Sequence, residues 1–95
     1  MKIKKTRIYQ DELHDILIHI AKDKISASLN FRKELNLKIK DIPNFPYKYR
    51  KSFYFNEEKV RDMIFMGYTI IFEIKLEINT IEILSIFNQN KPSEI

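Results

Sequence analysis

Two prolines, Pro43 and Pro46, divide this chain into halves whose apolar residues repeat with different periods. Before the prolines, two sets of mostly apolar residues recur at the spacing of one face of a helix. The first set is Tyr9, Leu13, Ile16, Leu17 and Ile20, and the second is Ser28, Phe31, Leu35, Ile39 and Ile42. Only a few residues join the two helices, so they predict an antiparallel helical hairpin. We expect Asp23 to cap the second helix and Pro43 to end it near Asp41.

After the prolines the chain is rich in Ile, Phe, Tyr and Met, as β-strands are. Four segments carry this composition: residues 52–56, 59–66, 68–75 and 79–87. Gly67, the only glycine, supplies the unusual backbone angles of a turn between the second and third segments. The links are short, so neighbouring strands should be antiparallel. The lysines of residues 2–7 suit a further short edge strand.

These elements predict an α+β domain. We expect an N-terminal antiparallel helical hairpin packed on a small, mostly antiparallel sheet of three or four strands, with a short N-terminal edge strand. The length of 95 residues predicts a single domain, residues 1–95. An apolar content of 44% distinguishes the chain from disordered polypeptides and supplies a core.

The composition excludes several classes of site. The chain has no cysteine, which excludes disulfides and zinc–thiolate sites, and its single glycine excludes glycine-rich phosphate loops. His14 and His19 lie about 140° apart around one helix and cannot share a metal ion, so we expect no metal and no cofactor. The longest uncharged apolar run, Met63 to Phe72, is about half the length of a membrane-spanning helix. No leader peptide is evident, and we expect a cytoplasmic protein without membrane contacts.

A basic cluster follows the prolines in this chain, whose net charge is +4. Its members are Lys48, Arg50 and Lys51, with Tyr47, Tyr49 and Tyr54 between and beside them. Cations interleaved with aromatic rings suit contact with phosphates and bases. Arg50 is the best single candidate, since a guanidinium group binds phosphate or carboxylate through two donors. A solvated loop that leads into a strand would have the same composition, so both interpretations stand.

Two charged residues, Arg61 and Asp62, lie inside an expected strand and on its opposite faces. Arg61 shares its face with Met63 and Phe65, where its head group either reaches water at a sheet edge or is a paired functional group. The next strand is apolar on both faces, whereas the helical hairpin covers only one. We therefore expect a partner to cover the other face, over Met63, Phe65 and Ile71.

Six features follow one another between Ile3 and Asn90: "ELHDILIHIAKD", "ASLNFRKELNLKI", the proline break, "YRKS", "VRDMIFMGYTIIFEI" and "IEILSIFNQN". In this order they resemble the RelE/ParE superfamily of type II toxins. The resemblance implies a small antiparallel sheet that carries two N-terminal helices. It also implies a cognate antitoxin that wraps the toxin with an acidic tail, and a heterotetramer with the antitoxin is one assembly we consider.

The superfamily divides by target. RelE-like toxins cut messenger RNA on the ribosome, whereas ParE-like toxins bind DNA gyrase, trap it on cleaved DNA and have no known catalytic activity. The RelE-like pattern has basic residues on the central strands, an arginine after a Gly-Tyr pair, and a Tyr, His or Arg near the carboxyl terminus. These groups activate the 2′-hydroxyl, stabilise the pentavalent phosphate and protonate the leaving oxygen.

This chain departs from the RelE-like pattern at each of these places. Asp62 stands at or near the basic central-strand position with Arg61 as its only basic neighbour, Thr69 replaces the arginine, and Lys91 is the only basic residue beyond Phe87. The resemblance is therefore closer to the ParE-like branch, and we expect inhibition of DNA gyrase by binding, without catalytic residues. The residues expected to bind the target or the antitoxin are Lys48, Arg50, Lys51 and Arg61. A RelE-like, ribosome-dependent messenger RNA endoribonuclease is the alternative.

Overall fold

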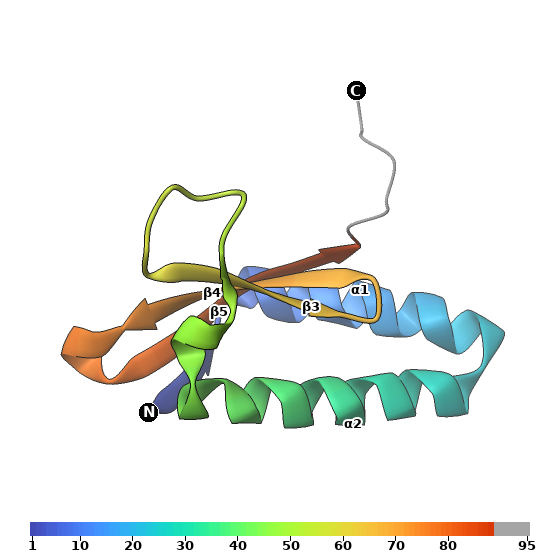
Figure 1. The fold of residues 1–95 in the computed structure, drawn as a ribbon. Helices are drawn as coiled ribbons and strands as arrows, with labels where there is room; N and C mark the ends of the chain where they lie inside the picture. The colour runs from blue at the N-terminus through green and yellow to red at the C-terminus, as the bar shows by residue number, and fades with distance from the viewer. Residues whose placement is uncertain (89–95) are drawn as a thin grey trace.

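In the computed structural model, which describes residues 1–88, the helical hairpin lies against one face of a five-stranded sheet (Figure 1). The helices are α1 (Arg7–Asp23) and α2 (Ile25–Asp41). The strands are β1 (Lys2–Lys5), β2 (Arg50–Lys51), β3 (Val60–Phe65), β4 (Tyr68–Lys75) and β5 (Thr80–Asn88). Their order is β1-β5-β4-β3-β2, with β1 parallel to β5 and the other pairs antiparallel. The predicted α+β class and the N-terminal edge strand are confirmed, and this edge strand makes the sheet mixed.

The ends of α2 agree only in part with the prediction. Asp23 is the last residue of α1 and does not cap α2, as the sequence had suggested. Lys24 occupies that position without a side-chain hydrogen bond, because an ammonium group has no acceptor for a backbone N–H. Its own backbone N–H donates to Ile20 O and completes α1. The two helices are thus joined by one residue, which leaves no room for a separate cap. At the other end, α2 stops at Asp41, two residues before Pro43, as expected.

The apolar stripes of both helices pack on a single face of the sheet. From the helices, the core contains Tyr9, Phe31, Leu35 and Ile39, with Leu13, Ile16, Leu17 and Ile20 partly buried against it. From the sheet it contains Met63, Phe65, Ile70, Phe72, Ile74, Ile81, Ile83 and Ile86. The Phe31 ring meets the rings of Phe65 and Tyr68 edge to face, at centroid distances of 5.3 and 5.4 Å. Both predicted helical stripes are therefore confirmed as the core-facing sides of the hairpin.

The first segment predicted as a strand, residues 52–56, is a loop, and that prediction was wrong. Ser52 N still donates to the first carbonyl of β3, at 2.9 Å. The next two donors turn to side chains instead: Phe53 N donates to Asp62 Oδ2 and Tyr54 N to Ser52 Oγ, each at 3.1 Å. Because side-chain oxygens accept these hydrogen bonds, the backbone leaves the strand ladder and turns.

The expectation that a partner covers Met63, Phe65 and Ile71 is corrected by their positions, because the chain itself buries all three side chains. Met63 and Phe65 belong to the core beneath the helices. Met63 pairs in register with Ile70, so the next residue of β4, Ile71, points to the opposite face of the sheet. The loop that follows β2 rises from that face (Figure 1). The three residues therefore neither share a surface nor lie open to a partner.

A β-bulge ties β5 to the start of α1. The register shift leaves Leu84 as an extra residue in β5. Thr6 Oγ1 donates a hydrogen bond to Leu84 O at 2.8 Å. Glu12 Oε1 accepts two hydrogen bonds, from Ser85 Oγ at 2.7 Å and from Ile86 N at 3.0 Å. Side chains at the start of α1 thus satisfy polar groups of the bulge and set the position of the helix on the sheet.

Glu12→Ala should lower the free energy of unfolding by about 1–2 kcal/mol, because it leaves Ile86 N without its acceptor. Glu12→Gln is the matched control: it retains an oxygen for the same donor and should lose less than about 1 kcal/mol. Denaturation in urea measures both values. An alanine variant as stable as the unchanged protein would contradict this role for Glu12.

Candidate functional site

The segment between α2 and β3 brings cations and exposed aromatic rings together. The exposed rings are Phe45, Tyr47, Phe53, Tyr54 and Phe55, and we call Phe53–Phe55 the aromatic loop. The cations are Lys48, Arg50, Lys51 and Arg61, and we call them the basic rim. The pairing of β2 with β3 sets Arg61 directly opposite Lys51. The structure therefore gathers all four predicted cations at one edge of the sheet.

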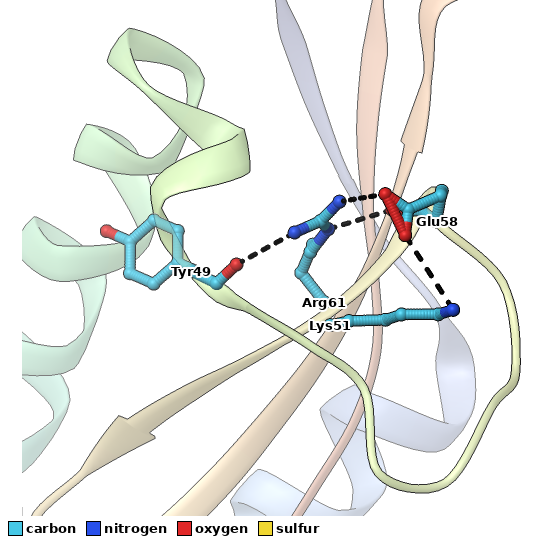
Figure 2. A network of polar contacts seen from close by, with 4 residues as sticks. All are labelled: Tyr49, Lys51, Glu58 and Arg61. Carbon is cyan, nitrogen blue, oxygen red and sulfur yellow. Dashed lines mark hydrogen bonds and ion pairs between the residues drawn. The ribbon is translucent and has the colours of Figure 1, made fainter.

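Arg61 is the most enclosed cation of the basic rim, with 11% of its side chain exposed (Figure 2). Its Nε donates to Glu58 O at 2.8 Å, its Nη1 donates to Tyr49 O at 3.2 Å, and its Nη2 pairs with the Glu58 carboxylate at 3.3 Å. The guanidinium carbon lies 4.9 Å from the centroid of the Tyr47 ring. Arg61 therefore joins the residue before β2 to the turn before β3, and each of its three nitrogens donates to a group of the chain.

Asp62 is a buried carboxylate on the opposite face of β3. Its Oδ2 accepts hydrogen bonds from Phe53 N at 3.1 Å and from Arg50 Nη2 at 3.4 Å. Its Oδ1 has no hydrogen-bond partner among the residues that the structure describes. A buried polar group without a partner costs on the order of 1–3 kcal/mol. Asp62 therefore holds the start of the aromatic loop at some cost in stability.

The other cations of the basic rim also have carboxylates nearby. Lys48 Nζ lies 3.8 Å from Asp41 Oδ2, and Lys51 Nζ lies 3.7 Å from Glu58 Oε2 (Figure 2). Arg50 forms an ion pair with Asp62. Both lysine pairs are partly exposed, and such pairs contribute little stability. They nevertheless reduce the local positive charge, so the basic rim is less basic than its sequence suggested.

A groove that the sequence analysis missed lies between α1 and the ends of β4 and β5. Its volume is about 500 Å³, and its lining comprises Glu12, Asp15, Ile16, His19, Tyr68, Ile86, Phe87 and Asn88. The fold here brings His19 close to Tyr68, although the two are far apart in the chain. The spacing of Glu12, Asp15 and His19 on one helix face was the available signal. Among the described residues, the lining contains two carboxylates and no lysine or arginine, and carboxylates repel phosphate groups.

The structure does not assemble the RelE-like pattern from the positions carried over. Thr69 is buried within β4, opposite Ile64 of β3 and Phe87 of β5. Asp62 is buried as well, beneath the aromatic loop that it holds. Lys91 lies outside the described residues.

Two kinds of feature are absent from residues 1–88. In this part of the chain, no group of three or more histidine, aspartate or glutamate side chains is placed to hold a metal ion. None of the helices there is both long enough and apolar enough to cross a membrane.

Comparisons with known proteins identify the family. The model of the family described as "ParE toxin of type II toxin-antitoxin system, parDE" matches residues 3–92. A search of curated proteins gives no match. Among solved structures, the chain is similar to one of the "Chromosomal ParDE TA system from P. aeruginosa", with a TM-score of 0.73. That likeness has 19% sequence identity over 93% of this chain and 95% of the other, and it shows a common fold. Because the family match covers nearly the whole sequence, the chain belongs to the ParE toxin family of type II toxin–antitoxin systems, within the RelE/ParE superfamily.

Proposed function

We propose that this ParE-family chain inhibits DNA gyrase by binding it and trapping it on cleaved DNA. The proposal rests on one observation: the side chains of Arg61 and Asp62 bind the backbone of their own chain. Arg61 donates to two backbone carbonyls, and Asp62 is buried against the backbone of Phe53. Both side chains shape the segment between β2 and β3 and neither faces outward. A protein that acts by docking needs such a preformed surface.

The geometry supports docking better than the cleavage of RNA. A metal-free ribonuclease stabilises a pentavalent phosphate with cations and moves protons with groups beside them. In the described part of the chain, Arg61 is enclosed and Thr69 is buried. The groove that holds His19 and Tyr68 has an acidic lining. A RelE-like endoribonuclease is therefore kept as an outcome of the test below.

The basic rim is the surface proposed for the target and for the cognate antitoxin. Lys48 and Lys51 are half-exposed and held only by weak ion pairs with Asp41 and Glu58. An acidic antitoxin tail could exchange its own carboxylates for these two. In this proposal a ParD-type antitoxin neutralises the toxin by covering the docking surface, in a heterotetramer of the two proteins.

Purified protein should inhibit DNA supercoiling by gyrase and cause cleaved DNA to accumulate, while leaving messenger RNA intact in a translation mixture. Lys48→Ala/Lys51→Ala should raise the concentration needed for half-inhibition by about three- to tenfold, since charges at the rim of an interface mainly assist association. The supercoiling assay measures both effects.

Lys2→Ala/Lys4→Ala is the matched control for charge. It removes the same two charges from β1, at the opposite edge of the sheet from β2, and should inhibit like the unchanged protein. RNA fragments with defined ends from ribosomes exposed to the pure protein, with gyrase unaffected, would refute the proposed function. Equal losses in both double variants would refute the role of the basic rim.

A further inference from the structure

We propose that the aromatic loop is a preformed apolar anchor that inserts into an uncharged cleft on the target protein. This inference rests on the proposed function, and it names the chemistry by which the same surface recognises gyrase. The loop presents three consecutive rings, with exposed fractions of 74% for Phe53, 52% for Tyr54 and 44% for Phe55. It rises from the face of the sheet that the helices do not cover (Figure 1). Exposed aromatic side chains of this kind supply most of the affinity in protein interfaces.

The local charge favours an uncharged protein partner over nucleic acid. The loop between β2 and β3, residues 52–59, contains one basic residue, Lys59, and two acidic residues, Glu57 and Glu58. One basic and two acidic residues leave a net charge of −1 on the segment that carries the rings. This segment therefore has no excess positive charge that would attract a polyanion.

Several contacts fix the loop before any partner arrives. Asp62 Oδ2 accepts from Phe53 N, and Ser52 Oγ accepts from Tyr54 N. The Tyr54 ring packs edge to face against Phe87 of β5, with 5.1 Å between centroids. The guanidinium carbon of Arg50 lies 3.8 Å from the Phe53 ring centroid. A binding segment that is already ordered loses less entropy on association, so these contacts favour affinity.

The burial of Asp62 is the independent sign that this ordering serves binding. A carboxylate with one oxygen unpartnered is an unfavourable group to bury, and stability alone would favour an apolar residue there. Its hydrogen-bond partners are the backbone of Phe53 and the side chain of Arg50, both at the start of the aromatic loop. Groups that lower stability in this way are expected where function requires them. Asp62 is therefore a positioning residue for the anchor.

The test measures binding of the full chain to gyrase holoenzyme without DNA. Phe53→Ala/Phe55→Ala should weaken the affinity at least about 30-fold, as for central aromatic anchors. The matched control is Ile25→Ala/Leu29→Ala, which truncates two comparably exposed apolar residues on α2 and should change the affinity less than about threefold. Melting temperatures of both variants should stay close to that of the unchanged protein. If the unchanged protein binds and Phe53→Ala/Phe55→Ala binds equally well, the anchor is refuted and the proposed function stands. If the unchanged protein does not bind, both fail.

The salt dependence of the affinity distinguishes an uncharged protein partner from a polyanion. Raising the salt from about 50 to about 200 mM should weaken the affinity for gyrase no more than about tenfold, because an apolar contact releases few counterions and only the charges of the basic rim are screened. A loss of about a hundredfold or more over that range would show polyanion-like binding and refute the inference.

Asp62→Ala tests the positioning role. It should weaken the binding of the folded protein to gyrase, because Phe53 N loses its acceptor and the start of the aromatic loop is no longer held. Asp62→Asn, which keeps an acceptor for Phe53 N, should recover most of the affinity. A lower melting temperature with unchanged affinity of the folded protein would show that Asp62 is only structural.

Discussion

Arg61→Ala should lower the free energy of unfolding by about 2–4 kcal/mol. The guanidinium group donates to the carbonyls of Glu58 and Tyr49, at 2.8 and 3.2 Å, and is almost fully enclosed. Without it, both carbonyls lose a charge-assisted hydrogen bond, and the ring of Tyr47 loses its cation. The residue before β2 and the turn before β3 would then no longer be joined through this side chain. Denaturation in guanidinium chloride measures this change in the free energy of unfolding.

Two variants isolate the cause of that loss. Glu58→Ala removes the ion pairs with Arg61 and Lys51, whose shared carboxylate is 77% exposed, and keeps the Glu58 carbonyl, so it should cost no more than about 0.5 kcal/mol. Arg61→Lys keeps the charge, but a single ammonium group cannot reproduce the planar fork, so it should be nearly as unstable as Arg61→Ala. If Glu58→Ala were as harmful as Arg61→Ala, the ion pair and not the carbonyl contacts would be the source. Any loss of toxicity in Arg61→Ala should then follow the folded fraction.

Raising the pH from about 8 to about 12 should remove on the order of 2 kcal/mol of stability through Tyr9. Burial raises the pKa of Tyr9 from 10.0 to about 12. The folded state therefore holds the phenolic proton more tightly than the unfolded chain. This contribution is fully present below pH 10, where the phenol is protonated in both states. It is lost as the pH rises to about 12, because the unfolded chain ionises first.

Tyr9→Phe is the control for this pH dependence. The Tyr9 hydroxyl is buried and has no hydrogen-bond partner among the residues that the structure describes, so its removal at neutral pH should be neutral or stabilising by about 1 kcal/mol. Lysines also titrate at high pH in both proteins, and the difference between the two urea denaturation series isolates the contribution of Tyr9. Parallel losses of stability in the two series above pH 10 would contradict the assignment.

Both helices and four of the five strands were predicted from the sequence, and only β2 was not. The helical stripes that begin at Tyr9 and Ser28 became the core-facing sides of α1 and α2. The segment after Gly67 became β4 with its predicted bounds, residues 68–75. These signals are periodic, and periodicity follows from the geometry of one helix or one strand without reference to the rest of the chain.

The predictions that were wrong concern contacts between segments that are distant in the chain. Residues 52–56 have the composition of a strand, but hydrogen bonds to the side chains of Asp62 and Ser52 end the ladder there. The partner expected over Met63 and Ile71 assumed a common surface, whereas register and alternation place these residues on opposite faces. Each outcome depends on how segments distant in the chain pack against one another. The strand propensity of single residues carries no information on that packing.

The candidate site shows the same division. The sequence predicted the cations of the basic rim, with Arg50 as the best single candidate, and marked Arg61 and Asp62 as unusual for a strand, but it left open whether the Arg61 head group reaches water or is paired. The structure shows Arg61 enclosed by two carbonyls and Arg50 partly exposed beside Phe53. In the sequence, the only sign of the groove that contains His19 and Tyr68 was the spacing of Glu12, Asp15 and His19 on one helix face.

By itself the sequence determined the order and kind of most elements, the two core-facing helix stripes and the family to which the chain belongs. Tertiary structure alone decided that Asp62 is buried against the aromatic loop, that Arg61 is enclosed and that the rings of residues 53–55 are exposed. The physical reason is the range of the interactions. Helix and strand periods arise between neighbours in the chain, whereas the burial and pairing of a charge depend on segments brought together by strand register and loop path.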